Sequence, residues 1–222
     1  MAQDDLGTWL VRQGELTAER LEDVFQHQVI YGGALDTNIL EMSLMAEDTL
    51  LNRLGQYLNL PTVAGSVLKT TDPDKVRLFP QKLAQKYGAA PFKVEGRNLS
   101  LALNAPPDLS TLDDIGFMLS VYIRPFAALE VRLAQALLRT YGVPPPARME
   151  NLLAQMGEDL DEDRAFVDRR RSTTLLTLDK PGSVPPPLPR PGARSPSKPP
   201  PLPTDLHRRP TPVRGEPQGT LS

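Results

Sequence analysis

The sequence predicts an α+β fold: an N-terminal four-helix bundle built from a tandem repeat, a small α/β subdomain with about three strands, and a disordered Pro-rich tail. Three observations predict this fold. A pattern of apolar and small residues recurs every 29 residues near the N-terminus. Helix signals then alternate with short runs of strand periodicity. Finally, fourteen of the 24 prolines lie after residue 180. The expected parts are 1–61, 62–142, a linker over 143–167, and the tail over 168–222.

The tandem repeat predicts two helix pairs. In the first copy, Gly14 stands where the first helix must end, and Thr17 is a suitable N-cap for the second helix. Ser43 and Ala46 occupy the equivalent positions of the second copy, so its turn is less well specified. Two pairs with matching apolar faces should pack as a four-helix unit. The expected helices span 4–13, 18–30, 34–42 and 47–58.

The α/β subdomain is predicted from caps and alternation. Asp72 and Pro73 should open a helix, because Asp is a good N-cap and Pro suits the first helical position. Alternating apolar and polar residues predict a strand, a turn at Glu95–Asn98, and a second strand within 89–103. A helix over 109–119, a strand over 121–126 and a helix over 127–141 complete the subdomain.

The linker contains one amphipathic segment. Met149, Leu152, Leu153 and Met156 are spaced as one face of a short helix, which runs into an acidic stretch over 157–163. The favoured interpretation is a solvated helix that frays, and the alternative is a helix that docks on a partner.

The tail cannot bury enough apolar surface to offset its ordering entropy, because no aromatic residue follows Phe166. We expect polyproline character over 184–191 and 198–203, which suits an aromatic groove on a protein partner or a plain spacer. Three hydroxyl residues follow an arginine run at 169–171 and are candidates for phosphorylation, although an unmodified basic run is the simpler interpretation. These residues are Ser172, Thr173 and Thr174.

Composition excludes several classes of function. Residues 1–166 hold fifteen Lys/Arg against twenty-three Asp/Glu, a net charge of −8, so the body is a poor binder of nucleic acid. The chain has no cysteine, and its two histidines, His27 and His207, lack partners at metal-ligand spacing. His27 is expected on a helix surface. No apolar run is long enough to insert in a membrane, and the N-terminus lacks a signal peptide, so we expect a cytoplasmic protein.

The repeat resembles the N-terminal domain of type II secretion and type IV pilus assembly ATPases. In that family each copy has Arg-Leu-Gly, a second Gly, a Leu-rich helix and a closing Gln, and the second copy runs on into Leu-x-Leu/Ile-Pro. Here the first copy has Leu6-Gly7, Gly14 and Gln28, and the second ends in Leu58-Asn-Leu-Pro61. The order of signals over 62–142 is also similar. In the ATPases a motor follows this domain, whereas no Gly-x-x-x-x-Gly-Lys-Ser/Thr motif occurs here, so no enzyme activity is expected.

The resemblance also implies a ligand, because some members of the family bind cyclic di-GMP between the two copies. The implied contact residues are Leu6, Gly7, Leu10, Gly14, Leu21, Phe25, Gln28, Leu35, Ile39, Leu50 and Leu54. The sequence departs from the family at its arginines, which are Asp5 and Ala34 here, and at the second-copy glycines, which are Asp36 and Ser43. Its closing Gln is Tyr57. Carboxylates at positions 5 and 36, together with the loss of both arginines, would repel a phosphate, so the apolar set is expected to be bundle core.

Two functions follow as hypotheses. The first is a non-enzymatic adaptor that needs no cofactor and docks protein partners, including a motor component, through its body and its tail. The alternative is a cyclic di-GMP sensor that regulates a secretion or type IV pilus machine.

Overall fold

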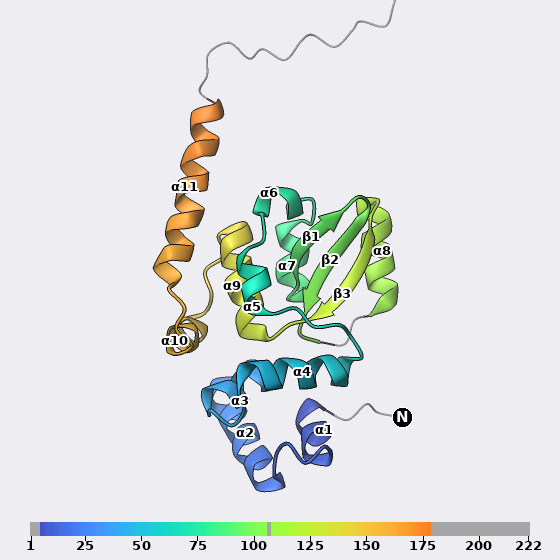
Figure 1. The fold of residues 1–222 in the computed structure, drawn as a ribbon, viewed down its shortest axis with the longest axis vertical. Helices are drawn as coiled ribbons and strands as arrows, with labels where there is room; N and C mark the ends of the chain where they lie inside the picture. Colours follow the sequence, from blue (N-terminus) through green and yellow to red (C-terminus); the bar gives the residue numbers. More distant parts are fainter. Residues whose placement is uncertain (1–4, 106–107, 179–222) are drawn as a thin grey trace, which may run out of the picture. The chain divides into compact units, whose positions relative to one another are not determined.

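The computed structural model describes residues 5–105 and 108–178. Its first four helices confirm the predicted repeat (Figure 1). They are α1 (Leu6–Arg12), α2 (Ala18–Tyr31), α3 (Leu35–Glu41) and α4 (Glu47–Leu58).

The turns inside the two copies have the same geometry. Gly14 and Ser43 both adopt left-handed backbone, with φ of 75° and 54°. Each donates its backbone N–H to the carbonyl of the residue three positions earlier. The next residue donates its N–H to the carbonyl of the residue five positions before it. Ser43 therefore makes the turn that Gly14 makes, in a conformation that favours glycine. The structure confirms the predicted cap of α2, since Thr17 Oγ1 accepts from the Arg20 N–H at 3.2 Å; α4, with Ala46 at the equivalent position, has no side-chain cap.

The α/β subdomain contains a three-stranded sheet in the order β1-β2-β3, with β1 and β2 antiparallel and β2 and β3 parallel. All three strands and the helices at Asp72-Pro73 and 109–119 confirm the predictions, and α9 begins three residues later than expected. The short helices α5 and α7 were not predicted. The elements are α5 (Gly65–Lys69), α6 (Pro73–Val76), α7 (Gln81–Tyr87), β1 (Ala90–Glu95), β2 (Asn98–Leu103), α8 (Leu109–Leu119), β3 (Tyr122–Ala127) and α9 (Glu130–Tyr141).

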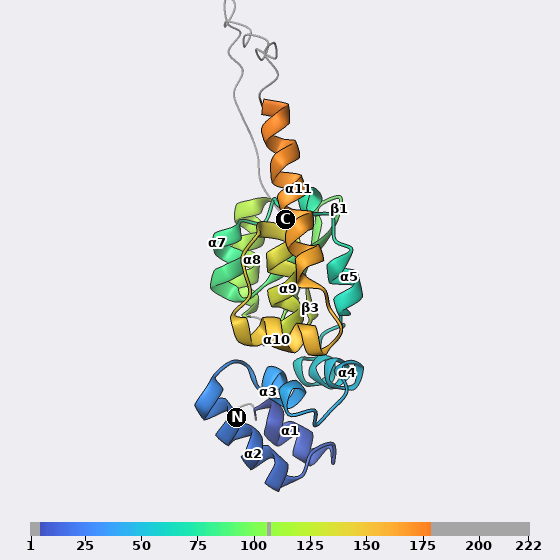
Figure 2. The ribbon, with the colours of Figure 1, turned by 90° about the vertical axis from the view of Figure 1, so that its left-hand side faces the viewer.

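Each face of the sheet carries a different core. Leu99, Leu101 and Leu103 alternate along β2 and pack on one face with residues of α7 and α8. Ala102 lies on the other face, in a cluster that includes Leu68 of α5 and residues of α9. The sheet is therefore covered by helices on both faces (Figures 1 and 2).

The bundle and the subdomain share apolar contacts. The main hydrophobic cluster contains bundle residues such as Leu10 and Leu50 together with Leu129 and Val131 at the start of α9. Thr62 forms a parallel bridge with Ala127 at the end of β3, so the chain leaving α4 lies beside the sheet.

The linker helix exists but is not a solvated, fraying helix, so the favoured interpretation was wrong. Helix α10 (Ala147–Gln155) buries Leu152 and Leu153 in the main hydrophobic cluster. Helix α11 (Leu160–Leu178) follows, and it continues about ten residues beyond the expected start of the tail at 168. Ser172 is exposed on this helix. The polyproline segments of the predicted tail lie outside the described residues.

The acidic stretch is held by arginines of α9, which explains why the helix does not fray. Arg132 donates to Glu47 at 2.6 Å and to Glu158 at 2.7 Å, and Arg139 pairs with the buried Asp163. Burial opposes the ionisation of Glu158, but hydrogen bonds from Gln135, Lys69 and Arg132 lower its pKa to about 2. These ion pairs hold α10 and α11 on α9.

Among the helices of residues 5–105 and 108–178, none is both long and apolar enough to cross a bilayer.

Replacing Arg132 by Ala should lower the free energy of unfolding by about 3 kcal/mol, because it removes the buried partner of Glu47 and one of the three partners of Glu158. Urea denaturation followed by circular dichroism would measure this. Arg164 is the matched control, since it also pairs with two carboxylates but lies more exposed. Arg164→Ala should cost less than about 1 kcal/mol. Equal losses in the two variants would contradict the role given to Arg132.

Candidate functional site

The residues implied as ligand contacts are mainly bundle core. Six of them are buried in the main hydrophobic cluster, which are Leu6, Leu10, Leu21, Ile39, Leu50 and Leu54. Phe25 and Leu35 are partly buried against the same cluster. A Cβ on Gly7 would lie 2.3 Å from Leu21 Cδ1, so this glycine permits helix packing. Gly14 lies in its turn with open space around it.

The polar members of the pattern also have structural partners. Gln28 donates through Nε2 to the Gly33 carbonyl at 2.8 Å and so closes the turn between α2 and α3. Asp5 is the N-cap of α1 and accepts from the Thr8 N–H at 3.0 Å. Partial burial raises the pKa of Asp5, but hydrogen bonds from Thr8 and Gly7 outweigh burial and lower this pKa below its usual value. The side chains of Gln28 and Asp5 are therefore both engaged in hydrogen bonds to nearby backbone groups.

Asp36, which the resemblance placed where a ligand phosphate would lie, accepts hydrogen bonds from protein groups in the structure. It is fully buried and accepts from the Glu130 N–H at 2.8 Å and from Asn104 Nδ2 at 2.9 Å. Glu130 in turn accepts from the Ala34 N–H at 2.8 Å and from the Thr37 hydroxyl at 2.6 Å. Each carboxylate therefore caps the helix to which the other belongs. We call these four hydrogen bonds the reciprocal cap.

The reciprocal cap places two carboxylates close together in a buried site. Desolvation raises the pKa of Asp36 to about 6, and the negative charge of Glu130 adds to the increase, although hydrogen bonds from Glu130 N–H and Asn104 oppose it. Sequence reasoning found neither the pairing nor Glu130, because the two residues lie 94 positions apart.

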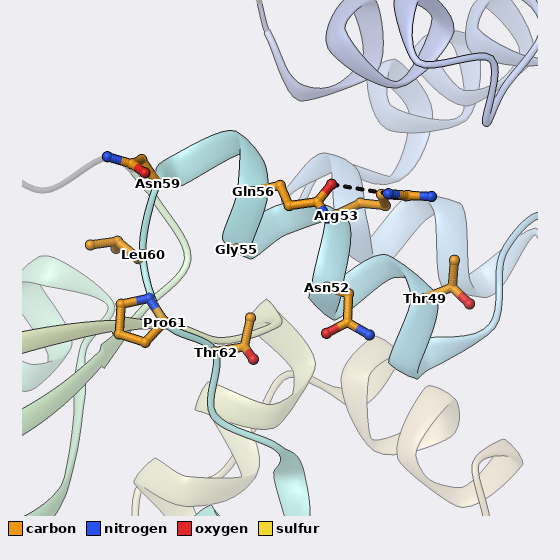
Figure 3. Close-up of a pocket in the computed structure, with 9 residues that line it drawn as sticks. All are labelled: Thr49, Asn52, Arg53, Gly55, Gln56, Asn59, Leu60, Pro61 and Thr62. Carbon is orange, nitrogen blue, oxygen red and sulfur yellow. Dashed lines mark hydrogen bonds between the residues drawn. The ribbon is translucent and has the colours of Figure 1, made fainter.

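A polar groove of about 720 Å³ lies along α4 and the segment that leaves it. Figure 3 shows the side chains of α4 and of residues 59–62 that line it. They are Thr49, Asn52, Arg53, Gln56, Asn59, Leu60, Pro61 and Thr62, with Gly55 beneath Thr62. None of the implied ligand residues is among them.

The side chains that line the α4 groove can form hydrogen bonds with a ligand. Its charged residue, Arg53, donates to Gln56 Oε1 at 3.0 Å and pairs with Glu15. The lining has no carboxylate, histidine, lysine or cysteine, so the hydroxyls of Thr49 and Thr62 have no general base beside them in the groove. In the described part of the chain, no group of three or more His, Asp or Glu side chains could hold a metal ion.

His27 belongs to a polar cluster and does not lie free on the helix surface, where the sequence placed it. Its Nδ1 lies 2.8 Å from Asn38 Oδ1, and its ring packs on Tyr31 with centroids 4.4 Å apart. Asn38 donates through Nδ2 to the carbonyls of Gly32 and Ala34, so its Oδ1 must accept. His27 therefore carries its proton on Nδ1 in this cluster.

The α/β subdomain exposes an apolar surface on α8 and β3. Phe117 is 90% exposed, and Leu109, Met118 and Tyr122 are also largely exposed. We call the surface formed by Phe117 and Tyr122 the α8 surface. A groove of about 470 Å³ runs between Phe117 and Tyr122, and the Arg97 guanidinium lies 5.5 Å from the Tyr122 ring centroid. A surface of this composition is typical of protein contacts.

The comparisons with known proteins confirm the predicted resemblance to the N-terminal domain of secretion and pilus ATPases. Residues 67–147 match the MshEN domain. The type IV pilus assembly ATPase PilB of Myxococcus xanthus (strain DK1622) is 26% identical over 158 residues, which cover 70% of this chain and 27% of the relative. The ATPase of the same name from Thermus thermophilus is 28% identical over 191 residues, covering 77% and 21%. The chain thus spans about a quarter of the length of these relatives.

Two solved structures are also similar. A structure of MshE with cdg is 28% identical, with a TM-score of 0.46, and covers 62% of this chain and 99% of that chain. A structure of the N-terminal domain of XpsE is 19% identical, with a TM-score of 0.44, and covers 64% and 100%. The MshEN match begins at Val67, so it includes the α8 surface but not the helical repeat.

Replacing Asp36 by Asn should flatten the dependence of stability on pH. The folded chain binds the Asp36 proton more strongly than the unfolded chain, so Asp36 contributes a loss of stability as pH rises from about 4 to about 6. Denaturant unfolding of wild type and Asp36→Asn at several pH values would isolate this contribution as the difference between the two curves. Asp36→Ala is the companion variant, and it should lose about 1–3 kcal/mol because the Glu130 N–H is left without an acceptor. A constant difference between wild type and Asp36→Asn across this range would contradict the raised pKa.

Isothermal titration of the full chain with cyclic di-GMP should give no binding heat at about 100 μM ligand, because the implied contacts are buried or occupied. The matched variant is Gln28→Ala. Low-micromolar binding by wild type that disappears in this variant would show that the pattern keeps its ligand.

Proposed function

We propose that this chain is a non-enzymatic docking module that acts in the cytoplasm and binds a protein component of a type IV pilus or secretion machine. The observation that carries the proposal is the α8 surface, which exposes two aromatic rings within the range matched by the MshEN domain. Exposed aromatic side chains contribute most of the binding energy at many protein interfaces. The α4 groove pairs its threonine hydroxyls with no carboxylate, histidine or lysine, which agrees with a role in binding.

The partner is expected to contribute side chains rather than a strand. Tyr122 N–H donates to the Arg97 carbonyl and Ala128 N–H donates to the Leu103 carbonyl, so even-numbered amides of β3 face β2. Pro125 is at an odd-numbered position and therefore lies on the outer edge, where it offers no N–H. Because Pro125 interrupts this edge, we expect an amphipathic helix that packs its apolar face on Phe117 and Tyr122.

The charged residues beside the α8 surface indicate which charges a partner should carry. Asp113 and Arg97 line the groove between Phe117 and Tyr122, and Asp114 is exposed next to Asp113 on α8. Charges of both signs set the orientation of a partner more than its affinity. A helix with a basic residue near its apolar face would meet Asp113.

A cyclic di-GMP sensor remains the competing function, supported by the first-copy pattern from Leu6 to Gln28. It has less support from the geometry, because Asp5 caps its own helix and Asp36 is buried. Docking through the Pro-rich tail and phosphorylation near Ser172 also remain predictions.

The proposal is tested by measuring binding of the full chain to a purified type IV pilus assembly ATPase from the same organism, by biolayer interferometry. We expect micromolar affinity, and a loss of about tenfold or more in Phe117→Ser. Phe117 contacts solvent in the free chain, so this variant should fold normally.

Val67→Ser is the matched control for this experiment, since Val67 is also exposed but lies on α5, away from α8. It should bind like wild type. Absence of binding at about 100 μM, or equal binding by wild type and Phe117→Ser, would overturn the proposal.

A further inference from the structure

The C-terminal end of α2 exposes three consecutive apolar residues. Val29 is 86% exposed, Ile30 is 72% exposed and Tyr31 is 59% exposed. Successive residues of a helix point in different directions, so these side chains surround the end of α2 rather than forming a stripe that the core could cover. Runs of exposed apolar residues are rare in soluble chains without a binding function. We call this feature the α2 tip.

A groove of about 600 Å³ lies next to the α2 tip. Ile30 and Tyr31 form one side of it, and α10 contributes Asn151, Leu152 and Gln155 on the other. Figure 2 shows α10 beside the end of the bundle that contains this groove. A protruding apolar tip and a groove that could receive one are therefore adjacent on one surface.

The charged groups of the groove are paired with each other. Arg148 forms a two-pronged pair with Glu41 and also donates to the Tyr31 and Gly32 carbonyls at 2.8 and 2.6 Å. These contacts fix α10 on the ends of α2 and α3. They leave the side chains of Ile30 and Tyr31, the His27 ring and the amides of Asn151 and Gln155 as the groups available to a partner.

The surrounding sequence is also uncharged. Residues 24–35 contain no Asp, Glu, Lys or Arg, and neither do residues 151–157, in a chain that is 23% charged. This distinguishes the α2 tip from the α8 surface, which has Asp113 and Asp114 beside it.

We propose that the α2 tip and its groove bind the same surface of a second copy, which gives a twofold symmetric dimer. Near a twofold axis each side chain approaches its own copy, so a charged surface repels itself. An apolar surface does not, and a carboxamide can pair with another carboxamide because it both donates and accepts. The tip of one copy fills the groove of the other, and the exchange is repeated across the axis. This proposal does not depend on the proposed function.

Sedimentation equilibrium of the full chain at pH 8, over about 1–200 μM, tests the proposal. We expect a reversible dimer whose dissociation constant changes little between low and high salt, because the contact is uncharged. Ile30→Lys should weaken the dimer about tenfold or more, since the new ammonium groups would approach each other. Lysine is also favourable near a helix C-terminus, so the variant should keep the helix.

Phe117→Lys is the matched control, because it places the same charge on the other exposed apolar surface. It should leave the dissociation constant unchanged. Gln155→Glu provides a second variant within the groove, and it should weaken the dimer more at low salt than at high salt. A monomer throughout this concentration range, or equal effects of Ile30→Lys and Phe117→Lys, would overturn the proposal.

Discussion

The reciprocal cap between α3 and α9 holds the bundle on the α/β subdomain. The N-termini of the two helices lie close together, and their backbone N–H groups carry partial positive charge. Without a nearby anion, both ends would lose hydrogen bonds in a buried site. Asp36 and Glu130 provide the anions, and each accepts from the other helix. The cap fixes the start of α9, from which Arg132 and Arg139 hold the helices that follow.

This arrangement gives the two copies of the repeat different roles. The second copy is committed to packing, because α3 is joined to α9 and the segment after α4 lies beside β3. The resemblance places Asp36 at a position where the ATPase family has glycine. Here the Asp36 side chain forms part of the reciprocal cap. The first copy has no equivalent attachment through Gly7, which instead lies under Leu21 and Leu35. At the end of α2, the backbone is held by Arg148, but the side chains of Val29, Ile30 and Tyr31 are exposed to solvent.

The sequence predicted those features whose signals are local. Caps, turns and apolar spacing located the repeat helices, and even the turn at Ser43 followed from its alignment with Gly14. The roles of Asp36 and of the acidic stretch were misjudged, because each depends on a distant partner. Asp36 binds a residue 94 positions away, and Glu158 needs Arg132, which lies 26 positions earlier. Without those partners, a carboxylate in the sequence resembles a solvated or repulsive group.

The α8 surface and the α2 tip differ in the charges around them, and this difference determines which kind of partner each can bind. The α8 surface has carboxylates and Arg97 beside it, so a complementary and therefore different protein can be selected and oriented. The α2 tip has only charges that are already paired with each other, so it cannot discriminate by charge but tolerates its own copy. One surface belongs to the α/β subdomain and the other to the bundle, and the reciprocal cap connects the parts that bear them. Neither surface includes residues of the other, so the two proposed contacts, with a different protein and with a second copy, use separate side chains.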